Sequence, residues 1–163
     1  MSYNEAMIKG RVAEAIVEQL FLSSGYNVFR YGMENTIPGI MELLRGVQGD
    51  VVENIKSMPD FVIQQKGDLN RVYFIEVKFR ASGDYNKHDL EKNHPKYPYK
   101  NAYIILVSRY HIKCVKVEEL YQGVEITQQS EHYYLGDRSE FNLDKGNIIK
   151  FCKFAAKFFE NVD

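Results

Sequence analysis

Two carboxylates and one lysine, placed in two short apolar segments, are the residues of this sequence best suited to chemistry. Asp60 lies in the segment MPDFVI at 58–63, and Glu76 and Lys78 lie in the segment FIEVKF at 74–79. Both segments are rich in β-branched and aromatic residues, and turn-forming residues separate them, which predicts a β-hairpin. Because side chains alternate along a strand, Glu76 and Lys78 are expected to share one face.

The chemistry that these residues suit is the hydrolysis of a phosphate ester with the help of a metal ion. In a hairpin, Asp60 at the start of one strand faces Glu76 near the end of its neighbour, at the edge of the sheet. Ionised carboxylates repel each other, and a hard divalent cation bound between them relieves that repulsion. The cation would polarise a phosphate and help to generate hydroxide from water, while Lys78 would orient that water or neutralise charge in the transition state.

A mixed α/β domain is expected to position the hairpin. Residues 4–24 have apolar side chains at helical spacing and are followed by a glycine suited to a left-handed cap, which predicts an amphipathic helix. Residues 102–107 are apolar on both faces, which predicts a buried strand. The other elements expected are strands at 26–31, 60–65, 71–79 and 112–117, a turn at 66–70 and a closing helix at 147–161.

The remaining segments are less regular. Short helices are expected at 40–44, 84–93 and 118–121, and residues 122–143 show little periodicity. Residues 50–58 suit either a polar excursion or another short helix. The stretch 32–59 is rich in turn signals and is expected to contact substrate or to move. The chain shows no internal repeat and no low-complexity linker, so residues 1–163 are expected to form a single domain.

Pro59-Asp60 and Glu76-Val77-Lys78 resemble the signature of the PD-(D/E)XK nuclease superfamily, which includes restriction endonucleases, Holliday junction resolvases and RecB-like repair nucleases. The resemblance implies a restriction endonuclease-like α-β-β-β-α-β core, with a central mixed sheet flanked by helices. The elements expected over 4–107 follow that order. The resemblance also implies a metal-dependent DNA endonuclease of the restriction, repair or recombination type.

The resemblance assigns a role to each matching residue. Asp60 and Glu76 would bind Mg²⁺, for which Mn²⁺ would substitute, and the backbone carbonyl of Val77 would be a further ligand. Lys78 would serve the attacking water. The superfamily often carries an acidic residue on its first helix, and Glu14 in the segment KGRVAE at 9–14 resembles that element. Glu18, one helical turn later, is the competing candidate for the same role.

Any surface that binds DNA phosphates must be local, because the net charge of the chain is only -1. One segment, 84–100, concentrates basic and aromatic side chains, with Tyr85, Tyr97 and Tyr99 among its lysines and histidines. Such a segment could contact phosphates and stack on bases or sugars. The residues expected to contact nucleic acid are Lys9, Arg11, Arg80, Lys87, His88, Lys92 and Lys96.

The composition is that of an ordinary globular protein. The hydrophobic fraction is 45% and the charged fraction 26%, and no apolar run is long enough to cross a membrane. The N-terminus lacks the basic-then-apolar order of a signal peptide. Cys114 and Cys152 have no metal-ligand spacing, and the four histidines show no zinc motif. These features favour a cytoplasmic location with both cysteines as reduced core residues.

Several alternatives stay open from the sequence. Asp60 suits an ordinary turn after proline, and Glu76 and Lys78 suit the solvated face of an edge strand. The rival function is a catalytically silent module that binds nucleic acid or a partner protein, and a role on RNA ranks below it. A homodimer would suit the cutting of two strands, and Phe151, Phe154, Phe158 and Phe159 of the closing helix suit either an interface or the core. A larger defence or repair complex is equally compatible with the sequence.

Overall fold

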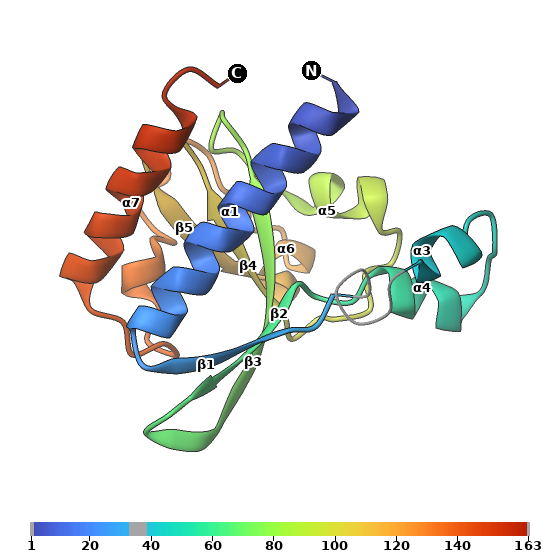
Figure 1. Cartoon of the computed structure of the whole chain (residues 1–163), viewed down its shortest axis with the longest axis horizontal. Helices are drawn as coiled ribbons and strands as arrows, with labels where there is room; N and C mark the ends of the chain where they lie inside the picture. Colours follow the sequence, from blue (N-terminus) through green and yellow to red (C-terminus); the bar gives the residue numbers. More distant parts are fainter. Residues whose placement is uncertain (1, 33–38, 163) are drawn as a thin grey trace.

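Five strands form one continuous sheet, and helices cover both of its faces (Figure 1). The computed structural model describes residues 2–32 and 39–162. The strands are β1 Tyr26–Arg30, β2 Phe61–Gln65, β3 Asp68–Phe79, β4 Tyr103–Val107 and β5 Ile112–Lys116, which lie side by side in the order β1-β2-β3-β4-β5. The helices are α1 Tyr3–Ser23, α3 Ile40–Leu43, α4 Asp50–Lys56, α5 Lys87–Asn93, α6 Val117–Tyr121 and α7 Lys145–Phe159, with a 3-10 helix at Leu135–Asp137.

The sheet is mixed, because one of its strand pairs is parallel. β3 runs parallel to β4, whereas β1 with β2, β2 with β3, and β4 with β5 are antiparallel. A parallel pair needs a crossover connection, and here α5 lies in that connection. The mixed α/β class is therefore confirmed. The hairpin was expected to place its carboxylates at the edge of the sheet, and this is wrong, because β3 is the middle strand and β4 occupies its free side.

One face of the sheet packs against α1 and α7, which lie in front of it in Figure 1. α1 begins where the Ser2 hydroxyl accepts a hydrogen bond from the Glu5 N–H at 3.2 Å, and it ends before Gly25, whose φ is 84°. A positive φ is the conformation that glycine adopts without strain, so Gly25 lets the chain turn directly into β1. The apolar stripe of α1 that fills this core consists of Ala13, Ile16, Val17, Leu20 and Phe21.

The second face packs against α5 and α6 and forms a separate apolar cluster. Along β4 the side chains alternate between the two clusters, with Ile104 and Leu106 on the α5 side. α5 is short, and a capping box between Asn86 and Asp89 satisfies its first N–H groups. Leu90 is its only buried residue among those described.

The aromatic residues of α7 divide between core and surface. Phe151 and Phe159 are buried in the first cluster, whereas Phe154 and Phe158 are 38% and 61% exposed. From the sequence, these four residues suited either the core or an interface. Phe151 and Phe159 belong to the core, whereas Phe154 and Phe158 stay exposed on the same helix.

Helices α3 and α4 project from one side of the sheet (Figure 1). The short helix expected within 40–44 is confirmed, and of the two alternatives for 50–58 the structure has the helix. α4 buries none of its described residues. The Tyr99 hydroxyl donates to the Asn54 carbonyl at 3.1 Å, and Ser57 Oγ lies 3.1 Å from His94 Nδ1. These bonds attach α4 to the segment after α5. Part of the stretch 32–59 lies outside the described residues.

Most expected element boundaries are confirmed to within a few residues. The turn expected at 66–70 is too long, because β3 already begins at Asp68 and a bulge between Gln64 and Gln65 adjusts the register. Cys114 is buried and Cys152 half-buried, and both are unpaired thiols. Among the described helices, none has both the length and the apolar character that crossing a membrane requires.

Candidate active site

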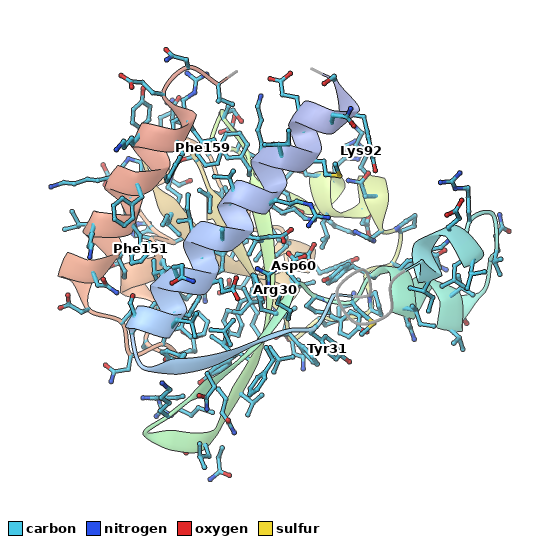
Figure 2. The ribbon with its side chains drawn as sticks, viewed as in Figure 1. Arg30, Tyr31, Asp60, Lys92, Phe151 and Phe159 are labelled. Atoms are coloured by element: carbon cyan, nitrogen blue, oxygen red, sulfur yellow. The ribbon has the colours of Figure 1, made fainter. Side chains whose placement is uncertain are left out.

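The β2–β3 hairpin brings Asp60 beside the middle of β3. The register pairs Phe61 with Ile75, so Asp60, one residue before β2, lies alongside Glu76. The Asp60 side chain is held there by a hydrogen bond, because the N–H of Val77 donates to its Oδ2 at 2.7 Å. Figure 2 shows Asp60 near the centre of the molecule, close to the ribbon of β3. Asp60 is half-buried and bonds to the neighbouring strand, which does not fit a free surface turn.

Glu76 and Lys78 form a close ion pair on one face of β3. Glu76 is 5% exposed, and its Oε1 lies 2.6 Å from Lys78 Nζ. The solvated face of an edge strand is therefore excluded for these two residues, because the strand is interior and the glutamate is buried. The Val77 side chain lies on the other face of β3, in the first apolar cluster beneath α1 and α7, as strand alternation predicts. Burial of a charged pair is costly unless each charge is compensated, which makes this an unusual place for purely structural residues.

Burial and neighbouring negative charge both disfavour the ionised form of Asp60. Burial raises the pKa of the Asp60 carboxyl well above its ordinary value, and the charges of Glu76 and Glu14 raise it further. Lys78 and the bond from Val77 act in the opposite direction without compensating fully. A carboxylate whose neighbours are also acidic binds a cation favourably, because the cation removes the repulsion.

Lys78 remains a cation in this environment. Burial is the largest single influence and lowers the pKa of its ammonium, but the charges of nearby groups, with Glu76 first, and the hydrogen bond to Glu76 together outweigh burial, so the net pKa is raised. Tyr85 and Asp60 add to that increase. A lysine held protonated cannot take a proton from water, but it can donate hydrogen bonds to water or to a phosphate oxygen.

The two acidic candidates on α1 have different surroundings. The charge of Glu14 acts on Asp60, so this residue lies within electrostatic reach of the hairpin carboxylates. Glu18 is engaged elsewhere, because its Oε2 accepts a hydrogen bond from Arg30 at 2.8 Å. Of the two, the arrangement favours Glu14 as a member of the site.

The donor set fits a hard divalent cation. Asp60 and Glu76 supply carboxylate oxygens, and Val77, between Glu76 and Lys78 in β3, has a backbone carbonyl. The carboxylates around Asp60 outnumber the one nearby lysine, Lys78. Within the described residues, no group of three or more His, Cys, Asp or Glu side chains surrounds one point. A metal held here would therefore take part of its coordination from backbone, water or phosphate oxygens, as Mg²⁺ usually does.

The seven residues expected to contact nucleic acid are not equivalent. Lys9 is only 6% exposed and forms an ion pair with Glu5 at 3.1 Å, which leaves little of its surface for a phosphate. Arg80 is half-buried, donates to the Phe79 carbonyl at 2.9 Å and lies over the ring of Tyr85. The exposed members of the set are Arg11, Lys87, His88, Lys92 and Lys96. Figure 2 shows Lys92 on α5, at the periphery of the molecule.

Two of the three tyrosines of segment 84–100 are not available as stacking surfaces. Tyr85 and Tyr97 are 1% and 0% exposed, and Tyr99 is half-buried against Phe74 with ring centroids 5.4 Å apart. The expectation that these rings stack on bases or sugars is therefore wrong for Tyr85 and Tyr97. The alternation of tyrosine with lysine is typical of a surface, but the rings of Tyr85 and Tyr97 are buried in the second cluster, whereas Lys92 and Lys96 are exposed.

Comparison of the chain with the models of known protein families, with curated proteins and with solved structures finds no match.

Proposed function

We propose that the protein is a metal-dependent nuclease that hydrolyses phosphodiester bonds in DNA. The observation that supports this best is the juxtaposition of Asp60, Glu76 and Lys78 on the β2–β3 hairpin, with the charge of Glu14 acting on the same point. Purely structural ion pairs seldom keep a half-buried aspartate among further carboxylates, because each acidic neighbour makes its ionisation less favourable.

A restriction endonuclease-like core is part of the proposal. The elements α1, β1, β2, β3, α5 and β4 follow the order α-β-β-β-α-β that the superfamily uses, with α3 and α4 inserted between β1 and β2. The parallel pairing of β3 with β4 gives the mixed sheet that this core requires. The positions of Glu14 on α1 and of Asp60, Glu76 and Lys78 at β2 and β3 support this part of the proposal.

The proposed mechanism gives each side chain a separate task. Asp60 and Glu76 would hold Mg²⁺ or Mn²⁺ together with the Val77 carbonyl, and the bound ion supplies Lewis acidity and a water of lowered pKa. Lys78, protonated and fixed by Glu76, orients the attacking water and stabilises negative charge that develops on the phosphate oxygens. Glu14 completes the acidic surface from α1. The P–O bond opposite the attacking water breaks, which leaves one phosphate end and one hydroxyl end.

The proposal is tested by cleavage of labelled linear, nicked, single-stranded and four-way-junction DNA in Mg²⁺, Mn²⁺ or EDTA. We expect metal-dependent cutting by the wild type, and a loss of roughly 100-fold or more in Lys78→Ala and Asp60→Ala, as for the removal of other groups that stabilise a transition state. Lys153→Ala, an exposed lysine on α7, is the control and should cut normally. Circular dichroism of each variant establishes that it is folded.

The same experiment separates the rival functions. Absence of cutting under every metal, with equal DNA binding by the wild type and both variants, would favour the catalytically silent module. Preferential cutting of an RNA strand of the same sequence would move the substrate class from DNA to RNA.

A further inference from the structure

The sheet face that carries Glu76 is open to solvent over its β1–β2–β3 part. On β3, Glu76 alternates with Phe74 and Val72, and the register places Phe29 of β1 in line with Phe74 across β2. Residues paired across neighbouring strands share a face, as does every second residue of one strand. We call this part of the sheet the open face, and its side chains include Asn27, Phe29, Tyr31, Gln64, Val72 and Phe74.

The open face is exposed, although the other side of the same strands is buried. Phe29 and Val72 are 54% and 50% exposed, and none of the six side chains is buried. The opposite side carries side chains that are at most 1% exposed, namely Tyr26, Phe61, Ile63 and Ile75. Among the described residues, the buried members of the second cluster come from β4, β5, α5, α6 and the segments between them. The helices of that cluster therefore do not bury the open face.

A row of aromatic rings links the open face to Asp60. The N–H of Tyr31 donates to the Asp60 carbonyl at 2.9 Å, and Figure 2 shows the two residues close together. The centroid of the Tyr31 ring lies 5.7 Å from that of Phe74, which lies 5.4 Å from that of Tyr99. Phe74 precedes Glu76 by two residues, or about 7 Å along β3. The row therefore begins at the candidate active site.

The open face has no charge of its own. Its six side chains are three rings, one valine and two carboxamides, and Asn27 Nδ2 donates to Gln64 Oε1 at 3.2 Å. Such a surface offers no counter-charge to a phosphate. A nucleobase, in contrast, presents a π-face to a ring and polar edges to a carboxamide. The chemistry of the open face thus complements bases, while the adjoining site suits the metal-bound phosphate.

The same sheet face is closed in the other direction. On the β4 side of Lys78 it is covered by the second cluster, in which Tyr85 and Tyr97 are 1% and 0% exposed. A polynucleotide whose scissile phosphate lies at Asp60 and Glu76 places its flanking nucleotides over accessible surface. Along β3, the accessible surface that adjoins these carboxylates is the open face.

We propose that the open face binds unpaired bases of the substrate, which stack on Phe29, Tyr31 and Phe74 next to the scissile phosphate. This inference rests on the proposed nuclease function and names its substrate class, a single strand or a duplex with an unpaired arm. Bases in a duplex stack on one another, so the rings of a sheet can stack only on bases that are unpaired. Stacking of this kind accepts any base, because every base has a π-face.

The test compares a short fluorescein-labelled DNA single strand with a duplex of the same length, by anisotropy in Ca²⁺. Phe29→Ala and Tyr31→Leu should each weaken single-strand binding roughly fivefold or more, because each removes one stacking ring. Phe29→Tyr keeps the ring and should bind as the wild type does. A single strand with abasic sites should bind the wild type and Phe29→Ala with equally low affinity. Duplex affinity should be the same for all variants.

Phe158→Ala is the matched control. Phe158 is 61% exposed, close to the value for Phe29, but it lies on α7, which packs against the other face of the sheet. Its variant loses an exposed ring of the same kind and should bind the single strand as tightly as the wild type does. Both positions are exposed, so neither Ala variant should lose much stability.

Cleavage in Mg²⁺ gives an independent readout. The wild type should cut a duplex with an unpaired arm faster than a blunt duplex. Phe29→Ala should reduce that preference, measured as the ratio of kcat/KM values, by roughly fivefold or more. The ratio isolates the open face, because the same carboxylates cut both substrates.

The outcomes separate this inference from the nuclease proposal. Wild-type cutting with unchanged single-strand affinity in Phe29→Ala and Tyr31→Leu would overturn the open-face inference alone. A dimer in sedimentation that Phe29→Ala dissociates, without a change in single-strand affinity, would also overturn it, because the face would then bind a second copy. A wild type that never cuts, but binds the single strand more tightly than both variants do, would overturn the nuclease and keep the open face. Failure of the wild type both to bind and to cut would overturn both.

Discussion

Among single residues, Asp60 has a carboxyl group whose ionisation the fold disfavours. Its carboxyl is half-buried, and burial together with Glu76 and Glu14 raises its pKa well above the ordinary value of 3.8. An acid whose folded pKa is raised stabilises the folded state fully below its unfolded pKa, and this contribution is lost as the pH rises through the folded pKa. At neutral pH the ionised form of Asp60 therefore opposes folding.

We expect Asp60→Asn to raise the melting temperature in metal-free buffer at neutral pH. The gain should shrink as the pH falls toward 3.8, where the wild-type carboxyl is itself protonated. Differential scanning calorimetry across that pH range measures the effect. Asp68→Asn is the control, because Asp68 is exposed and pairs with Arg71 at 3.3 Å, so its variant should show no gain. An equal or lower melting temperature for Asp60→Asn would argue that the ionised carboxyl of Asp60 does not destabilise the folded state.

Glu14 and Glu18 offer a second comparison between single residues. If Glu14 takes part in the acidic site, Glu14→Gln should weaken the binding of Mn²⁺ several-fold, because one negative charge near Asp60 is removed. Glu18→Gln removes the same charge one turn away, where it only breaks a pair with Arg30, and should leave Mn²⁺ affinity unchanged. Isothermal titration of Mn²⁺ into each variant compares them. Equal affinities in both variants would remove Glu14 from the site.

At the level of helices and strands, local pattern predicts the elements well but not their long-range pairing. The hairpin of β2 and β3 follows from two apolar runs and the turn between them, and it determines that Asp60 meets Glu76. The central position of β3 depends on its parallel pairing with β4, across a connection that includes α5. No local pattern specifies which distant strand pairs with which, so the expected edge position of the carboxylates was wrong.

α7 contacts the end of β3 through the buried ring of Phe159. Phe159 is 2% exposed and stacks on Phe79, the residue after Lys78, with centroids 4.1 Å apart. We expect Phe159→Ala to lower the free energy of unfolding by about 3 kcal/mol or more, because a large buried ring leaves a cavity. Phe158→Ala, at a 61% exposed position, should change it by less than about 1 kcal/mol. Urea denaturation followed by circular dichroism compares the two, and equal losses would contradict the burial of Phe159.

Across the whole molecule, the residues of the candidate site could be predicted from the sequence, whereas the buried residues around that site could not. Asp60, Glu76 and Lys78 could be found because a short motif lies on adjacent strands. The burial of Tyr85 and Tyr97 could not, since tyrosine suits surface and core alike and the sheet face that receives these rings is built from β4. For the same reason, the basic segment 84–100 was expected to present aromatic rings, of which Tyr85 and Tyr97 are in fact buried.

The overall charge balance leads to a prediction about DNA binding. With a net charge of -1, the chain can attract phosphates only through a local group of cations, and the exposed candidates near α5 include Lys92 and Lys96. Each phosphate neutralised releases counterions, so the logarithm of affinity should fall with the logarithm of salt concentration with a slope of about -0.9 per contact. A few contacts would give a slope of about -3, far shallower than that of strongly basic DNA-binding proteins.

The double variant Lys92→Gln with Lys96→Gln should make that slope shallower by roughly 1 to 2 and weaken binding alike for all sequences. The control is Lys153→Gln with Lys157→Gln on α7, which changes the net charge equally but lies on the helix that packs against the opposite face of the sheet. Anisotropy titrations of a labelled duplex at several salt concentrations give both slopes. Because total charge is matched, a difference between the two variants can come only from where the charges lie. Equal slopes would mean that the DNA does not follow α5, and a shallower slope for the α7 variant would move the binding face to α1 and α7.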